Sequence, residues 1–135
     1  MTYRIPKAAV ALLLLVGGCV NWTDPQALRT RDLDDLCTGY WAYGPSRQAL
    51  GHYPERAAAI RAELVRRNEV PQNEWHLIDE NRIRIGMTTC GALASWGIPE
   101  RVHKLTTSSG TRTQIVFKDG NYVYVENGVV TAVQS

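Results

Sequence analysis

The chain has 135 residues, of which 44% are hydrophobic and 21% are charged, so it has the size and composition of one globular domain rather than a disordered tail or a multidomain enzyme. Its formal net charge of +2 comes from 15 basic and 13 acidic residues. Two of the basic residues, Arg4 and Lys7, belong to a predicted export segment, and without it the charges balance at 13 of each sign. Because nucleic-acid binding needs clustered positive charge, this balance argues against a nucleic-acid partner.

Residues 1–18 are predicted to be a lipoprotein signal peptide. Arg4 and Lys7 form a positive n-region, and Ala8–Val16 is a continuous apolar run. That run covers about 14 Å as a helix, less than half of a hydrocarbon core of about 30 Å, so it is too short to span a membrane. Val16–Cys19 (VGGC) resembles a bacterial lipobox. The resemblance implies cleavage before Cys19 and a diacylglycerol on its thiol; an ordinary secretory peptide followed by a cysteine by chance is the alternative.

The residue after Cys19 predicts where the lipoprotein goes. In the lipobox family, aspartate at this position retains a protein in the inner membrane, whereas this chain has Val20. We therefore expect a lipid anchor in the outer membrane of a bacterial cell envelope, with the protein facing the periplasm. Residues 19–23 are the expected lipidated tether, and residues 24–135 are the expected domain.

The remaining cysteines, Cys37 and Cys90, form an even pair in an oxidising compartment, which predicts a disulfide between them. Two buried free thiols or a metal site are the alternatives. His52, His76 and His103 are scattered, and no C-x-x-C or H-x-x-x-H spacing gathers ligands. We therefore expect neither a metal nor another cofactor.

Residues 24–96 are predicted to be mainly helical. Asp24-Pro25 is an N-cap followed by proline at the first helical position, which predicts a helix with a boundary near residues 29–31 and a second helix that ends at Gly44-Pro45. The remaining helix signals are capping residues, prolines and glycines. They predict helices from Tyr53 to Asn68, from Pro71 through Ile78, and over Thr88–Trp96 before Gly97.

Residues 101–134 are predicted to form an antiparallel β-meander. Its β-rich runs are Val102, Gln114–Lys118, Tyr122–Glu126 and Val129–Val133. Asp119-Gly120 and Asn127-Gly128 between them are strong signals for two-residue hairpin turns, in which both residues need positive φ. The expected fold class is therefore α+β, with N-terminal helices packed on a small antiparallel sheet in two layers.

Two-residue turns would fix the register of the sheet. Phe117 would lie opposite Tyr122, Ile115 opposite Tyr124, and Tyr122 opposite Val133, which makes both faces apolar. Either the helices between residues 24 and 80 cover the second face, or it stays open. The open face would be the aromatic one and would bind partners. Its candidate binding residues are Ile115, Phe117, Tyr122 and Tyr124.

Residues about 82–133 resemble a family of small outer-membrane lipoproteins. The resemblance is carried by Ile85–Thr88 (IGMT), Leu93, Trp96–Pro99 (WGIP) and Glu126–Thr131 (ENGVVT), with two hairpins between them. This pattern is similar to the SmpA/OmlA, or BamE-like, lipoproteins. The resemblance implies helices paired with a three-stranded antiparallel sheet, a layout shared with β-lactamase-inhibitor-like domains. It also implies an accessory role in an envelope protein machine, and it assigns no partner-contact residue.

The sequence offers little for catalysis. It has no G-x-S-x-G elbow and no glycine-rich phosphate loop. His76, Asp79 and Glu80 could share a helical turn as an acid–base cluster, but an exposed polar face is the simpler interpretation. Cys37 and His52 could form a nucleophile and base, but this interpretation needs a free Cys37 thiol, which the predicted disulfide with Cys90 would use. The four tryptophans fit core packing better than carbohydrate stacking.

These patterns predict a non-catalytic envelope lipoprotein that acts as a scaffold or adaptor for protein partners. The alternative is an inhibitor or exclusion lipoprotein that blocks an envelope enzyme or receptor.

Overall fold

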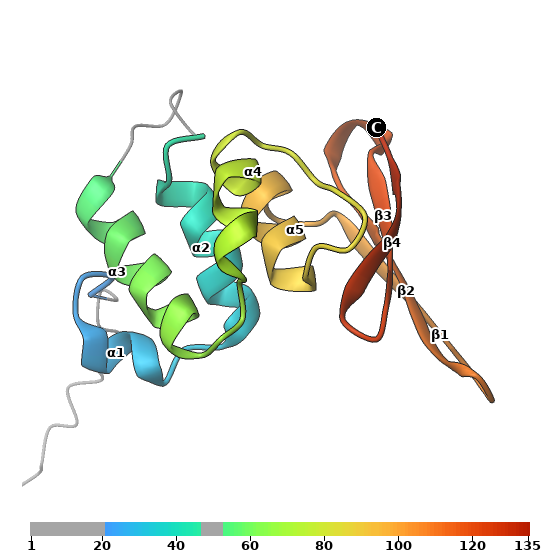
Figure 1. The fold of residues 1–135 in the computed structure, drawn as a ribbon, viewed down its shortest axis with the longest axis horizontal. Coiled ribbons are helices and arrows are strands. Elements are labelled where there is room, and N and C mark those ends of the chain that lie inside the picture. The colour runs from blue at the N-terminus through green and yellow to red at the C-terminus, as the bar shows by residue number, and fades with distance from the viewer. Residues whose placement is uncertain (1–20, 47–52) are drawn as a thin grey trace, which may run out of the picture.

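The computed structural model describes residues 21–46 and 53–135, and in this part of the chain the fold is α+β, as predicted (Figure 1). The helical elements come first and the strands follow. The helices are α1 (Pro25–Arg29), α2 (Leu33–Tyr43), α3 (Pro54–Arg66), the 3₁₀ turn η2 (Gln72–Glu74), α4 (Trp75–Asp79) and α5 (Thr89–Trp96). The strands are β1 (Arg101–Thr107), β2 (Gly110–Val116), β3 (Tyr122–Glu126) and β4 (Val129–Gln134), with the 3₁₀ turn η3 (Lys118–Gly120) between β2 and β3.

Capping residues set the helix boundaries where the sequence predicted them. The Asp24 side chain accepts a hydrogen bond from the Gln26 N–H, and Pro25 begins α1. At α5, the Thr88 side chain accepts a hydrogen bond from the Gly91 N–H. Gly97 ends α5 with a φ of +91°.

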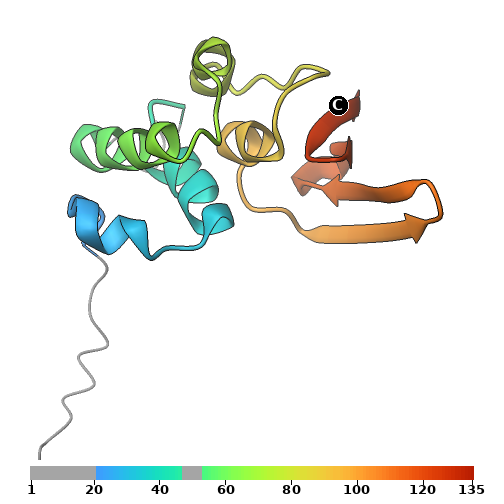
Figure 2. The ribbon, with the colours of Figure 1, turned by 60° about the horizontal axis from the view of Figure 1, so that its bottom comes forward.

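The sheet lies at one end of the molecule, and α1 and α3 lie toward the other (Figures 1 and 2). Helix α5 packs against β4 on one side and against α2 and α4 on the other. Figure 2 shows α5 between the sheet and the other helices, all on the same side of the sheet. The expected two-layer packing is therefore made by α5, while α1–α4 build a separate helical body behind it.

A single hydrophobic core joins the helical body to the sheet. It contains Leu36, Ile60, Leu64 and Ile78 from the helical body, continues through Ala92 and Leu93 of α5, and ends on Ile115, Val123, Val125 and Val130 of the sheet. The predicted disulfide is present: Cys37 of α2 and Cys90 of α5 are bonded, with their Cα atoms 5.3 Å apart. It fixes α5 to the helical body, and through α5 it fixes the position of the sheet.

In the described residues the sheet has four antiparallel strands in the order β1-β2-β3-β4. The resemblance implied three strands. The additional strand is β1, of which only Val102 was predicted to be β-rich. It pairs with β2 along its whole length, from Arg101 opposite Val116 to Thr107 opposite Gly110.

The predicted register of β2 against β3 is wrong by one residue. Val116 lies opposite Tyr122 and Ile115 opposite Val123. Asp119 and Gly120 do adopt positive φ, 66° and 78°, but Lys118 joins them to make a three-residue loop. Its ends meet where the Phe117 N–H donates to the carbonyl of Asn121 at 2.7 Å. An added loop residue turns every following side chain to the other face.

A second shift occurs between β3 and β4. Asn127-Gly128 forms the predicted two-residue turn, with Glu126 opposite Val129. The register then shifts beside Tyr124/Val125, so Tyr122 lies opposite Gln134 rather than Val133. Such a bulge places two residues of one strand against one of its neighbour.

Candidate functional site

The corrected register separates the four predicted binding residues onto two faces of the sheet. Ile115 and Phe117 are each 3% exposed and belong to the core face, where the Phe117 ring meets Trp96 edge-on at 5.4 Å. Tyr122 and Tyr124 lie on the opposite face. Ile115 and Phe117 therefore cannot belong to an open aromatic face, and that part of the prediction is wrong.

The tyrosine face, defined here as Val116, Tyr122, Tyr124 and Ala132, points away from the described helices (Figure 2). The expectation that α1–α4 cover it is wrong, because these helices pack behind α5. Tyr122 and Tyr124 remain half-buried because their rings meet edge-on at 5.5 Å. The Tyr122 hydroxyl also donates to Gln134, and the Arg112 guanidinium lies 4.2 Å from the centre of the Tyr124 ring.

A groove of about 870 Å³ opens on the other side of the β1–β2 hairpin, between the hairpin and helices α2 and α5. Leu93 and Ile115 contribute to its apolar lining on the core side, and Ile98 and Val102 at its mouth are exposed. Asp34 and Asp35 of α2 line one wall, and Lys104 of β1 lines the wall formed by the hairpin. Its remaining lining comes from Thr38, Thr89, Pro99, Gly110, Thr111, Thr113, Val125, Asn127 and Gly128.

Strand β1 gives this groove an available strand edge. All seven residues of β1 are exposed, and β1 is the first strand of the sheet. The other edge strand, β4, is partly covered, since Val130 N–H donates to the Met87 carbonyl and Gly86 N–H donates to the Val130 carbonyl, both at 2.8 Å. An exposed edge beside an apolar groove can accept an extended peptide as an additional strand.

The groove was not predicted from the sequence. Its position depends on how the hairpin stands against α2 and α5, which no local pattern reveals. The available signal was the β-rich run Arg101–Thr107 directly after Ile98-Pro99, because this run predicts a strand that follows an apolar residue.

The structure does not assemble the candidate acid–base cluster. Tyr40 is buried, and its hydroxyl donates to Asp79 Oδ1 at 2.6 Å. Burial and this bond to a carboxylate raise the pKa of Tyr40. Glu80 pairs with Arg82 at 3.1 Å, and within the described chain no hydrogen bond or ion pair joins His76 to either carboxylate. Asp79 thus has a structural partner, and His76 is simply exposed.

The other sequence candidates fall into three groups. Cys37 is in the disulfide and is not a free nucleophile, while His52 lies outside the described residues. Cys19, the predicted lipidation site, also lies outside them. Among residues 21–46 and 53–135, no group of three or more histidine, cysteine or acidic side chains is placed to hold a metal ion.

The tryptophans take part in packing. Trp75 is buried, and Trp96 packs on Phe117 as described above. Trp22 packs against the core, where a Cβ on Gly39 would come within 3.0 Å of its ring.

In the part of the chain that the structure describes, no helix is both long and apolar enough to cross a membrane.

Comparison of the chain with family models, with curated proteins and with solved structures finds no match. The resemblance to the SmpA/OmlA lipoproteins therefore rests on the motif residues alone and stays a prediction.

Proposed function

We propose that this chain is a non-catalytic lipoprotein of the bacterial cell envelope, which Cys19 anchors in the outer membrane and which binds protein partners as a scaffold or adaptor facing the periplasm. The observation that carries this proposal is the placement of the two uncovered sheet surfaces. The tyrosine face belongs to the sheet, which lies at the end of the molecule away from α1 (Figure 1), and the groove lies between the β1–β2 hairpin and helices α2 and α5. An anchor two residues before Asn21 would therefore leave the tyrosine face and the β1–β2 hairpin, which forms one wall of the groove, directed away from the membrane.

Three further observations support the proposal. The Cys37–Cys90 disulfide fits an oxidising compartment such as the periplasm. The groove combines an apolar lining with an exposed strand edge, which is a common way to bind an extended segment of another protein. The motif residues Ile85–Thr88 and Trp96–Pro99 resemble accessory outer-membrane lipoproteins.

Affinity capture from detergent-solubilised membranes, with partners identified by mass spectrometry, tests the partner-binding role. The informative variant is Ile98→Ser at the mouth of the groove, and its matched control is Ile85→Ser outside the groove. The two isoleucines are 67% and 63% exposed, so both changes remove a similar exposed surface. We expect the first change to lower partner recovery at least fivefold and the second to leave it unchanged. Equal recovery with both variants would contradict a role for the groove.

The variant Cys19→Ala tests the anchor. The wild-type protein should incorporate labelled palmitate and sediment with membranes, and Cys19→Ala should yield an uncut or soluble form. A variant that stays in the membrane pellet with unchanged mobility, beside a wild type without palmitate, would contradict lipidation.

A second candidate function is inhibition or exclusion, in which the protein blocks an envelope enzyme or receptor. The observation that favours it is the β1–β2 hairpin, which projects beyond the helical layer with all of β1 exposed (Figure 1). A projecting hairpin has a shape that can enter the cleft of an enzyme. The two functions differ in what is captured: an inhibitor binds one enzyme stoichiometrically and abolishes its turnover, whereas a scaffold copurifies with several components of membrane machinery.

A further inference from the structure

A cluster of aromatic rings lies beside α1 and the start of α3, on the side of the helical body away from the sheet (Figure 1). We call it the aromatic end and define it as Trp22, Tyr43 and Tyr53 with Arg31 and Arg56. The ring centres of Trp22 and Tyr43 are 5.4 Å apart, and those of Tyr43 and Tyr53 are 5.7 Å apart. The three rings therefore form one continuous group, although they come from the start of the described chain, the end of α2 and the residue before α3.

Two arginines extend this aromatic surface. The Arg31 guanidinium lies 4.6 Å from the Trp22 ring centre, and that of Arg56 lies 4.8 Å from the Tyr53 ring centre. Arg31 also pairs with Asp35 at 3.4 Å, and Glu55 is exposed next to Arg56, so the surface has mixed charge. The surface therefore consists of amphipathic aromatic rings with polar groups at their edges. Side chains of this kind are enriched at membrane–water interfaces.

Part of this surface is open. Tyr53 is 46% exposed although its ring contacts that of Tyr43. Beside it lies a hollow of about 430 Å³, lined by Asn21, Thr23, Tyr53, Pro54, Glu55 and Arg56. The first described residue of the chain thus forms one wall of the hollow.

The position of Cys19 in the sequence determines what can cover this surface. Only two residues, Val20 and Asn21, lie between Cys19 and Trp22, and these three steps along a fully extended chain reach about 10 Å. Trp22 is itself fixed by its packing against α2. A lipid on Cys19 would therefore hold Trp22 within about 10 Å of the headgroup layer, too close for another folded domain to lie between the membrane and this part of the aromatic end.

We infer that the aromatic end is a membrane-contact surface, which rests on the phospholipid headgroups of the leaflet that holds the anchor. This inference rests on the proposed lipidation of Cys19 and deepens it, because it fixes the orientation of the domain. The helical body lies on the membrane and the sheet stands away from it. The groove and the tyrosine face are then held at a defined height above the leaflet.

Tryptophan fluorescence in brominated lipid tests the contact. The full lipidated protein is reconstituted into vesicles of phosphatidylethanolamine and phosphatidylglycerol, with or without bromine on the acyl chains near the headgroup. The variant Tyr53→Trp places a reporter at the aromatic end, and Tyr122→Trp is its control at the sheet end. Both replace a tyrosine that touches another ring, so the two changes are comparable.

We expect brominated lipid to quench the fluorescence added by Tyr53→Trp at least twofold more than that added by Tyr122→Trp. In the otherwise wild-type background, Trp22→Phe should lower the quenching and Trp96→Phe should leave it unchanged. If neither added tryptophan is quenched, or both are quenched equally, the contact surface is wrong.

Mass spectrometry of the same samples separates the two ways of failing. A diacylglyceryl group on Cys19 without quenching at Tyr53→Trp overturns the contact surface and leaves the anchor intact. An unmodified Cys19 overturns both. Quenching without groove-dependent partner capture overturns the role of the groove in partner binding and leaves the membrane contact standing.

Discussion

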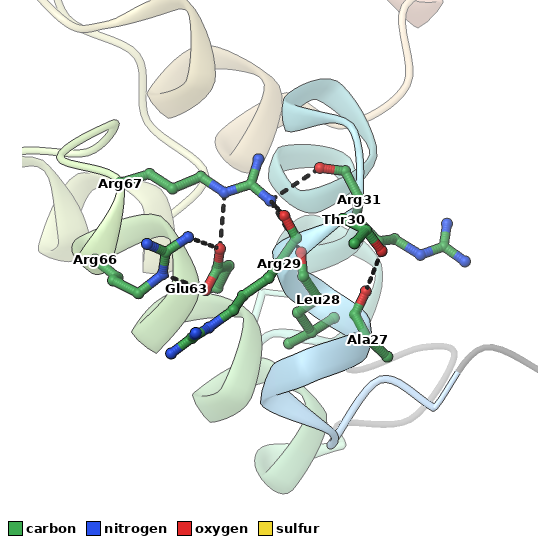
Figure 3. Close-up of polar contacts among 8 residues, drawn as sticks. All are labelled: Ala27, Leu28, Arg29, Thr30, Arg31, Glu63, Arg66 and Arg67. Carbon is green, nitrogen blue, oxygen red and sulfur yellow. Dashed lines mark hydrogen bonds and ion pairs between the residues drawn. The ribbon is translucent and has the colours of Figure 1, made fainter.

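Glu63 of α3 holds the Arg67 side chain in place, and Arg67 in turn fixes the end of α1 (Figure 3). The Arg67 Nε donates to Glu63 Oε1 at 2.8 Å, and its Nη2 donates to the carbonyls of Leu28, Arg29 and Arg31 at 2.9–3.1 Å. Carbonyls at a helix end otherwise need water or a cap. Two helices that are distant in sequence are thus joined through one buried carboxylate.

Replacing Glu63 by glutamine should destabilise the protein by about 2–3 kcal/mol at pH 7, because it removes the charge that pairs with Arg66 and Arg67. Hydrogen bonds from Arg66, and with them those from Arg67, lower the pKa of Glu63 to about 2 against the opposing effect of burial. A carboxylate with a lowered folded-state pKa stabilises the fold above its ordinary pKa of 4.5. That contribution is lost as the pH falls towards 2.

The measurement is urea denaturation of wild type and Glu63→Gln between pH 2 and pH 8. The difference in unfolding free energy should be constant above about pH 5 and should shrink below it. Glu80→Gln is the control, since the Glu80–Arg82 pair is exposed and worth less than about 1 kcal/mol. A difference for Glu63→Gln that does not change with pH would contradict the lowered pKa.

Removing the disulfide should lower the unfolding free energy by more than the loss of any single hydrogen bond would. The bond closes a loop across 53 residues, for which the chain-entropy argument gives about 4 kcal/mol. We expect Cys37→Ala/Cys90→Ala to unfold at markedly lower urea concentration. Native exported protein should resist thiol labelling at both positions, and peptide mapping without reductant should find the cross-linked fragment. Labelling of both cysteines in the native protein would contradict the bond.

The helices were predictable because their signals are local. Asp24, Thr88 and Gly97 each mark a helix boundary through a hydrogen bond or a φ value that only neighbouring residues determine. The disulfide was predicted from the expected oxidising compartment and from the even pair that remains if Cys19 is lipidated. None of these inferences needed to know how distant elements meet.

The sheet register and the groove were not predictable in the same way. Asp119-Gly120 fits a two-residue loop and a three-residue loop equally, and the choice depends on whether Phe117 is buried under α5. The shift beside Val125 has no marker in the sequence. The groove depends on the angle between a hairpin and two helices, and its lining comes from segments as far apart as Asp34 and Gly128.

Gly97 should tolerate no side chain. Its φ is +91°, and a Cβ there would lie 2.3 Å from a ring atom of Trp41. We expect Gly97→Ala to lower the unfolding free energy by about 3 kcal/mol or more, because steric overlap adds to the strain of positive φ. Gly128→Ala is the matched control: its φ is +77°, but nothing lies within 4 Å of the added carbon, so strain alone should cost about 1–2 kcal/mol. Thermal unfolding followed by circular dichroism compares the two, and equal costs would show that Trp41 moves aside.

Mutations on the two faces of the sheet should lower the stability of the protein by different amounts. Tyr122→Ser/Tyr124→Ser changes the face that the described helices leave uncovered, so the melting temperature should fall by only about 2–4 °C. The loss of two aromatic rings should still weaken partner capture at least fivefold if this face binds partners. Phe117→Ala is the contrasting change, because Phe117 is in the core and its truncation should cost about 3–5 kcal/mol. A large fall in melting temperature for the tyrosine pair would mean that these rings serve as core, and the partner-binding role of Tyr122 and Tyr124 would then be withdrawn.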